Sequence, residues 1–97
     1  MPYIIQSPRA EEDLEEIWYY IAKDNITRAN EWVNAITHTF NRIAEQPKIG
    51  KARPELENGV RCLPTGNYLI LYKPVKCGIE IYRILHGARD VGKAWNT

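Results

Sequence analysis

Three short β-prone runs in the last third of the chain constrain the fold more than any other feature of the sequence. They are Val60–Pro64, Tyr68–Pro74 and Ile79–Leu85. Turn-forming segments of three and four residues, which contain Gly66 and Gly78, separate them. Such spacings suit strands that are consecutive antiparallel neighbours. The sequence therefore predicts a three-stranded antiparallel meander.

The N-terminal part of the chain predicts one strand and one amphipathic helix. Tyr3–Ile5 is a short apolar run that ends before Ser7. Ser7 is a suitable N-cap and Pro8 a suitable first helical residue, so a helix is expected from Pro8 to about Lys23. The apolar stripe of this helix consists of Ala10, Leu14, Ile17, Trp18 and Ile21. The acidic residues that suit the positive end of its dipole are Glu11, Glu12 and Asp13.

A second amphipathic helix follows after a break at Asp24 and Asn25. Either Asn25 or Thr27 is its N-cap, and Pro47 stops it. The short connection predicts an antiparallel helical hairpin. A helical hairpin that packs on one face of a C-terminal meander is an α+β arrangement. One such domain, residues 1–97, accounts for the whole length.

The composition argues against several classes of protein. Cys62 and Cys77 are fifteen positions apart, and the two histidines, His38 and His86, are distant from each other in sequence. This spacing does not match a zinc site, so no metal and no other cofactor is expected. The sequence has no apolar run of 18 residues and no basic leader before an apolar run. A soluble cytoplasmic protein with free cysteines and no membrane contact is expected.

Charge is distributed unevenly along the chain. Residues 1–46 carry four Lys and Arg against eight Asp and Glu, a net −4, whereas residues 47–97 carry nine against four, a net +5. Part of the basic half is Pro47–Gly59, which has no periodicity and is expected to be a surface loop. An acidic partner, either nucleic acid or an acidic peptide, is expected on the basic half.

Four motifs together resemble the ParE toxins of the RelE/ParE toxin superfamily. They are A-x-x-D-L-x-x-I-W-x-Y-I-A at Ala10–Ala22, P-x-I-G-x-x-R-P-E-L at Pro47–Leu56, R-x-L-P-x-G-x-Y-x-I-x-Y at Arg61–Tyr72 and I-x-R-I-L-H-G-A-R-D at Ile81–Asp90. Each motif is weak alone, but their order along the chain is specific. The resemblance implies the toxin of a bacterial type II toxin–antitoxin pair, which inhibits DNA gyrase and is not an enzyme.

The resemblance also implies the partners. A ParD-like antitoxin is expected to neutralise the toxin by direct binding in a hetero-oligomer, with DNA contacted only through the antitoxin. No catalytic residue is assigned. The residues expected to contact the antitoxin or the target are Lys51, Arg53, Arg61, Arg83, His86, Arg89 and Trp95.

Two alternatives to a gyrase inhibitor remain open. One is a ribosome-dependent mRNA endonuclease of the RelE kind, and the other is an inactive toxin fold that serves as a binding module. The mRNA-cleaving members of the superfamily have a basic residue after the G-x-Y element and a Tyr or His-Tyr near the C-terminus. Here Leu69 follows Tyr68, and the tail Val91–Thr97 contains neither Tyr nor His. The resemblance therefore disfavours the nuclease.

Several of the candidate side chains have two interpretations. Arg61, Arg83, His86 and Arg89 lie near strand ends, where they are expected to reach solvent and a partner. His86 either acts in proton transfer or hydrogen-bonds locally, for example with Asp90. Trp95 either folds back on the sheet as a plug or anchors a partner. The tail that carries Trp95 is expected to form no regular element.

Overall fold

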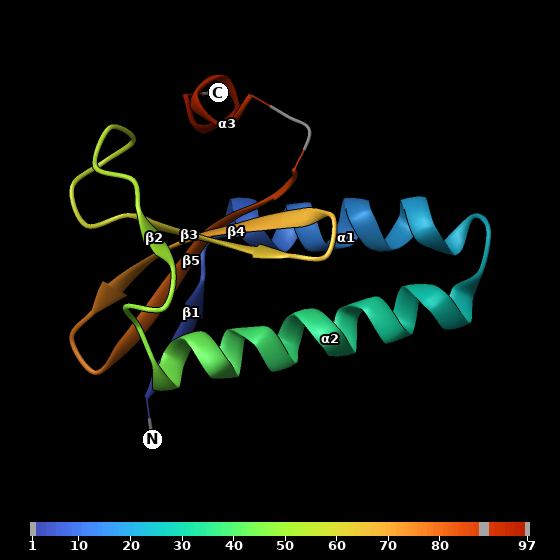
Figure 1. The fold of residues 1–97 in the computed structure, drawn as a ribbon. Helices are drawn as coiled ribbons and strands as arrows, with labels where there is room; N and C mark the ends of the chain where they lie inside the picture. The colour runs from blue at the N-terminus through green and yellow to red at the C-terminus, as the bar shows by residue number, and fades with distance from the viewer. Residues whose placement is uncertain (1, 88–89, 97) are drawn as a thin grey trace.

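The long helices and the short C-terminal helix lie on opposite sides of one sheet (Figure 1). The computed structural model describes residues 2–87 and 90–96, and its five-stranded sheet has the order β1-β5-β4-β3-β2. In chain order the elements are β1 (Tyr3–Gln6), α1 (Pro8–Ala22), α2 (Ile26–Glu45), β2 (Lys51–Ala52), β3 (Arg61–Thr65), β4 (Tyr68–Val75), β5 (Gly78–His86) and α3 (Val91–Trp95). Within these ranges, no helix combines the length and the apolar character needed to cross a membrane.

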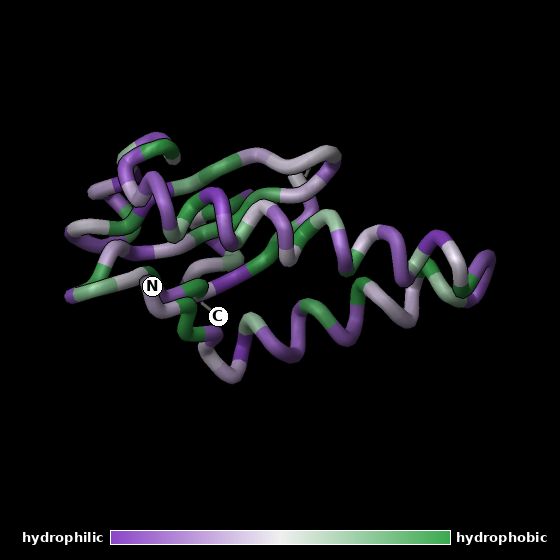
Figure 2. Tube along the Cα trace, turned by 90° about the horizontal axis from the view of Figure 1, so that it is seen from below, coloured by the Kyte–Doolittle hydropathy of each residue, from purple (hydrophilic) through white to green (hydrophobic). Residues whose placement is uncertain are grey.

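Polar side chains start the two long helices where the sequence predicts. The Ser7 hydroxyl accepts a hydrogen bond from the backbone N–H of Ala10 at 3.1 Å, so α1 begins at Pro8. The Asn25 side chain accepts one from the N–H of Arg28 at 3.0 Å. Asn25, rather than Thr27, is therefore the N-cap of α2. Hydrophilic and hydrophobic positions alternate along both helices (Figure 2), and the hydrophobic ones face the sheet and the neighbouring helix.

The predicted meander is confirmed, and two further strands extend it at opposite edges. β3, β4 and β5 are consecutive antiparallel neighbours, and β1 pairs with β5 in parallel. The other addition, β2, lies in the segment 47–59, which was expected to be irregular. Lys51 and Ala52 pair there with Cys62 and Arg61, and the N–H of Arg53 donates to Val60 O at 2.8 Å. The expectation was wrong for these two residues, because a two-residue strand leaves no periodic pattern in a sequence.

Two hydrophobic clusters lie on the two faces of the sheet. The helix-side core contains Ala10, Ile36, Phe40, Ile43, Ala44, Ile70, Tyr72, Ile79, Ile81 and Ile84. The α3-side core contains Cys62, Leu71 and Leu85, with Leu56, Leu69, Val91, Ala94 and Trp95 packed against them. Both faces are therefore covered, and the alternating apolar residues of β4 supply both clusters.

A bulge in β5 decides which side chains face which layer. Tyr82 has no partner where the register between β4 and β5 shifts. One extra residue moves all later side chains to the opposite face of the sheet. Ile81 before the bulge and Ile84 after it therefore both belong to the helix-side core. Arg83 and Leu85 are turned toward α3 instead.

The C-terminal tail forms a helix, contrary to the expectation that it closes no regular element. The Asp90 side chain accepts a hydrogen bond from the N–H of Lys93 at 3.1 Å and caps α3. Val91, Ala94 and Trp95 then lie on one face of the helix and contact the α3-side core. The capping residue and this i, i+3, i+4 spacing explain why even five residues form a helical turn here.

A buried tyrosine fixes the segment that follows α2. Tyr72 is fully buried, its hydroxyl donates to Pro47 O at 2.7 Å, and it accepts from the N–H of Gly50 at 2.8 Å. The approach is so close that a Cβ at Gly50 would lie 2.7 Å from the hydroxyl. Glycine is therefore required at this position for the segment to reach β2.

Three tyrosine hydroxyls and one cysteine thiol are partly or fully buried, and we therefore expect the protein to lose stability at alkaline pH. Burial raises the pKa of Tyr68, Tyr72 and Tyr82 above the ordinary 10.0 and that of Cys62 above the ordinary 9.0. As the pH rises, these groups therefore ionise at a lower pH in the unfolded chain than in the folded protein, which favours the unfolded chain. Stability should be unaffected by these groups below about pH 9 and should fall progressively above it.

Denaturant unfolding at about pH 8 and about pH 11 measures this loss. Tyr72→Phe should lose less stability between the two values than the wild type, because it lacks one of the groups. The control is Tyr3→Phe, since Tyr3 is 65% exposed. An equal alkaline loss in wild type and Tyr72→Phe would contradict the assignment to Tyr72.

Candidate functional site

The predicted binding residues do not form one cluster. Lys51 is exposed on the edge strand β2. Arg53 is half-buried, and its Nε donates to Glu55 Oε2 at 2.6 Å. Arg61 donates through Nη1 to Gly50 O at 2.7 Å, and so holds the segment before β2. These three cations share the β2–β3 edge of the sheet, where Lys51 extends into solvent. Arg89 lies outside the described residues.

Arg83 is buried, which corrects the expectation that it reaches solvent at a strand end. Arg83 is 7% exposed. Its guanidinium donates from Nε to Asp13 Oδ2 at 2.8 Å and from Nη2 to Asp13 Oδ1 at 3.1 Å. Nη1 donates to Ala94 O at 3.0 Å. The bonds with Asp13 raise the pKa of Arg83 further above its usual range. Arg83 therefore connects α1, β5 and α3 inside the protein.

Asp13 was not predicted as a site residue, yet three of the hydrogen bonds at this site end on its carboxylate. Besides pairing with Arg83, its Oδ2 accepts from the backbone N–H of Ile84 at 2.9 Å. β1 pairs with β5 only as far as Ile81, so the backbone groups of β5 beyond it need other partners. Asp13 accepts from the N–H of Ile84, and Ser7 Oγ donates to Tyr82 O at 2.8 Å. The signal was present, because Asp13 lies beside Ala10 and Leu14 on the apolar face of α1. A carboxylate on such a face needs a buried partner.

Trp95 folds back on the sheet. Its ring centroid lies 5.5 Å from that of Tyr82, and it packs against the α3-side core. A shallow cavity of about 260 Å³ lies beside it, between the start of α1 and the loop before β3. Trp95 is half-buried, so one side of the indole remains accessible next to this cavity. The plug described above as one alternative is the arrangement that the structure has.

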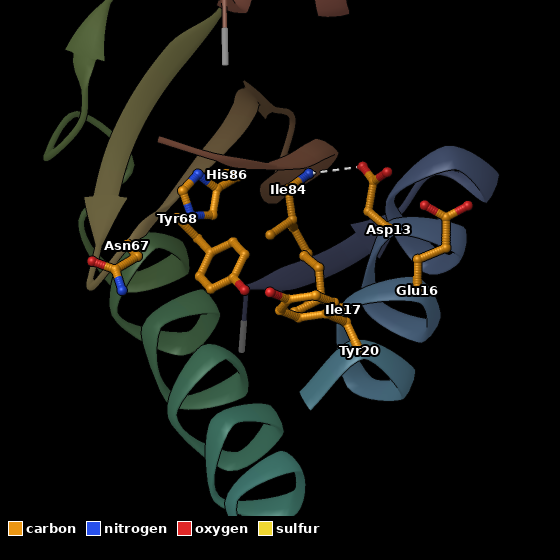
Figure 3. A pocket seen from close by; sticks show the side chains of 8 residues that line it. All are labelled: Asp13, Glu16, Ile17, Tyr20, Asn67, Tyr68, Ile84 and His86. Carbon is orange, nitrogen blue, oxygen red and sulfur yellow. Dashed lines mark hydrogen bonds between the residues drawn. The ribbon is translucent and has the colours of Figure 1, made fainter. Parts of the chain in front are cut away.

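His86 lines the cavity that lies between α1 and the ends of β4 and β5 (Figure 3). The volume of this cavity, which we call the α1–β5 cavity, is about 470 Å³. The residues that line it are Asp13, Glu16, Ile17, Tyr20, Asn67, Tyr68, Ile84 and His86. The ring of His86 packs edge-on against Tyr68 at a centroid distance of 5.5 Å. His86 is exposed, and the contact with Tyr68 fixes the position of its ring.

The α1–β5 cavity has an acidic and aromatic lining. Its two carboxylates come from α1, and its two phenol rings come from α1 and β4. Burial, together with the neighbouring Tyr20, raises the pKa of Tyr68. Among residues 2–87 and 90–96, no three His, Cys, Asp or Glu side chains are placed to hold a metal ion. Such a lining can accept hydrogen bonds and stack against flat or cationic groups.

Comparison with known proteins places this fold and its motifs in one family. Residues 4–91 match the family described as "ParE toxin of type II toxin-antitoxin system, parDE". "Toxin ParE1" of Mycobacterium tuberculosis is 33% identical over 89 residues, which is 90% of this chain and 91% of that protein. "Toxin ParE1" of Caulobacter vibrioides is 33% identical over 86 residues, 88% of each chain.

A solved structure shows the same fold. It is described as "Chromosomal ParDE TA system from P. aeruginosa", and it aligns with a TM-score of 0.73 at 22% identity over 89% of this chain and 96% of that one. The strand, helical hairpin and meander that the sequence predicts therefore occur in that solved chain as well. On the family match and the identity to its curated members, this chain belongs to the ParE family of toxins of type II toxin–antitoxin systems.

Proposed function

We propose that this toxin acts by binding rather than by catalysis, that it inhibits DNA gyrase, and that a ParD-like antitoxin neutralises it by direct contact. The observation that carries the non-catalytic part is the burial of Arg83 in its pair with Asp13. A nuclease that works without a metal needs cations that stabilise the charge developing on the phosphate. In this protein Nε, Nη1 and Nη2 of Arg83 all donate to internal acceptors, and Nη1 of Arg61 donates to Gly50 O.

The surroundings of the α1–β5 cavity also disfavour RNA cleavage. A phosphate entering this cavity would meet the carboxylate of Glu16, whereas that of Asp13 is paired with Arg83. The described lining contains neither Lys nor Arg. Leu69, at the position where mRNA-cleaving relatives have a basic residue, packs against the α3-side core instead. His86 and Tyr68 could take part in proton transfer, but an anionic substrate would be repelled before either could act.

Exposed apolar and basic side chains provide the surfaces for partners. Tyr19, Tyr20 and Ile26 are 65%, 73% and 60% exposed near the tip of the helical hairpin, which extends past the sheet (Figure 1). We assign the antitoxin to the hairpin and to the basic β2–β3 edge. The partner-binding residues proposed on the β2–β3 edge are Lys51, Arg53 and Arg61. His86, Arg89 and Trp95 stay proposed as partner- or target-binding residues from the sequence alone. The proposed complex is a hetero-oligomer in the cytoplasm, where gyrase acts, and it contacts DNA only through the antitoxin.

Expression in a bacterial host tests this function. Inducing the toxin should arrest growth and induce the DNA-damage response, because a blocked gyrase leaves broken DNA. Co-expression of the small reading frame next to the toxin gene should suppress both effects. Primer extension on abundant mRNAs is the second readout, and it should show no new ends. Codon-specific mRNA cuts without a DNA-damage response would instead support a ribosome-dependent nuclease.

A further inference from the structure

One carboxylate beside the α1–β5 cavity has no counterion among the residues that the structure describes. Glu12, Asp13 and Glu16 all lie close enough to Arg83 to raise its pKa. Asp13 takes the guanidinium of Arg83, and Glu12 Oε2 lies 4.0 Å from Arg9 Nε. Within residues 2–87 and 90–96, the side chain of Glu16 forms neither a hydrogen bond nor an ion pair. This part of the cavity therefore has excess negative charge.

The aromatic rings are placed next to this charge. Glu16 and Tyr20 are four residues apart on α1, so both project from the same face of the helix. Tyr68 approaches from the start of β4, and Figure 3 shows its hydroxyl directed toward the hydroxyl of Tyr20. Tyr68 is held between Trp32 and His86, with centroid distances of 5.3 and 5.5 Å. The cavity thus combines a carboxylate with one fixed and one exposed phenol ring.

We propose that the α1–β5 cavity receives one basic side chain, an arginine or a lysine, from the toxin-binding segment of the antitoxin; this inference rests on the function proposed above. A guanidinium can bond with a carboxylate edge-on while its face stacks on a tyrosine. Glu16 supplies the carboxylate, and Tyr20 and Tyr68 supply the rings. The basic side chain would neutralise the charge that Arg83 leaves uncompensated.

The exposure of Tyr20 argues for a protein side chain rather than a free small cation. Tyr20 is 73% exposed, so a small ion bound beside it would remain in contact with water, where an ion pair contributes little. A partner segment that covers Tyr20 and Ile17 excludes water and strengthens the same pair. The apolar groups that cover Tyr20 and Ile17 and the cation that pairs with Glu16 therefore have to come from one partner. The acidic lining would repel the phosphates of a nucleic acid.

The affinity of the toxin for its antitoxin tests this assignment. The antitoxin is the product of the neighbouring reading frame, purified and titrated into wild-type toxin, Glu16→Gln and Tyr20→Leu by calorimetry at low salt. Glu16→Gln should bind at least about tenfold more weakly, since a charged contact at a covered interface is lost. Tyr20→Leu should also bind more weakly, since the cation loses the face of an aromatic ring. The matched control is Glu15→Gln on the same helix outside the cavity, which should change affinity less than about twofold. Equal affinities of Glu16→Gln and Glu15→Gln would overturn the proposal.

A second probe separates failure of this inference from failure of the proposed function. N-acetyl-arginine amide is titrated into ¹⁵N-labelled toxin, with N-acetyl-citrulline amide as its uncharged isostere. The arginine derivative should bind weakly, because a small cation leaves Tyr20 in contact with water. It should still shift the amide resonances of Tyr68 and Ile84 in a saturable manner, and the citrulline derivative and the Glu16→Gln variant should give no such shift. If the neighbouring gene product does not bind, the proposed function fails, and this titration alone decides on the cavity. Equal shifts with both derivatives would overturn the inference.

Discussion

Replacing Arg83 by methionine is expected to lower the free energy of unfolding by about 3–5 kcal/mol. The substitution keeps an apolar chain of similar length but removes the only cation that the described structure places on Asp13. Asp13 is 7% exposed, so its carboxylate would remain buried without a counterion. The bond from Arg83 Nη1 to Ala94 O at 3.0 Å, which ties α3 to the sheet, would be lost as well. For a domain stabilised by about 5–15 kcal/mol, the loss is a large fraction of the total.

Equilibrium unfolding in urea measures this effect, and two further variants identify its cause. Asp13→Asn combined with Arg83→Met should be more stable than Arg83→Met alone, because the amide carries no charge and its oxygen can still accept from the N–H of Ile84. Arg53→Met should leave the unfolding midpoint nearly unchanged, because the Arg53–Glu55 pair lies at the surface. If Arg83→Met were as stable as Arg53→Met, the buried pair would not be a main element of the fold.

Removal of α3 is expected to have a comparable effect on stability. A chain that ends at Asp90 loses Val91, Ala94 and Trp95 from the α3-side core and exposes Leu71 and Leu85, which are 0% and 1% exposed. Trp95→Ala alone should cost about 2–3 kcal/mol, less than the about 3–5 kcal/mol of a fully buried tryptophan, because the ring is half-buried. The truncation should cost more, since it also removes the acceptor of Arg83 Nη1.

Thermal unfolding of the truncated chain, Trp95→Ala and Trp95→Phe tests the role of the tail. Trp95→Phe should be intermediate, because phenylalanine keeps part of the contact with Tyr82. Lys76→Ala, at an exposed position in the turn between β4 and β5, is the control and should unfold like the wild type. A truncated protein that retained wild-type stability would mean that α3 serves partners only and does not stabilise the domain.

The elements that depend on local signals were predictable from the sequence. Ser7 before Pro8 and Asn25 after Asp24 set the starts of the two helices, because each side chain satisfies a backbone N–H within three residues. The turn around Gly66 likewise joins two strands that are adjacent in sequence. These contacts need no knowledge of distant parts of the chain. The α+β fold class follows from them.

The candidate site was less predictable, because its main contacts are long-range. Asp13 and Arg83 are 70 positions apart, so neither reveals its partner in the sequence. The bulge at Tyr82 then reverses the alternation along β5, which turns Arg83 inward and Ile84 toward the helices. If side chains are assumed to alternate between the two faces along the whole strand, Arg83 and Ile84 are both assigned to the wrong face. The α1–β5 cavity depends on the same pairing of distant elements, and of its lining only His86 was predicted as a site residue.

The supercoiling activity of purified DNA gyrase tests the central claim most directly. Relaxed plasmid, ATP and gyrase are incubated with increasing amounts of the folded toxin, with and without the product of the neighbouring reading frame. We expect the toxin to inhibit supercoiling and to cause cleaved plasmid to accumulate, and we expect the antitoxin to restore the activity. Trp95→Ala, assayed below its melting temperature, shows whether the accessible side of the indole takes part. Undiminished supercoiling in the presence of excess folded toxin would contradict the account.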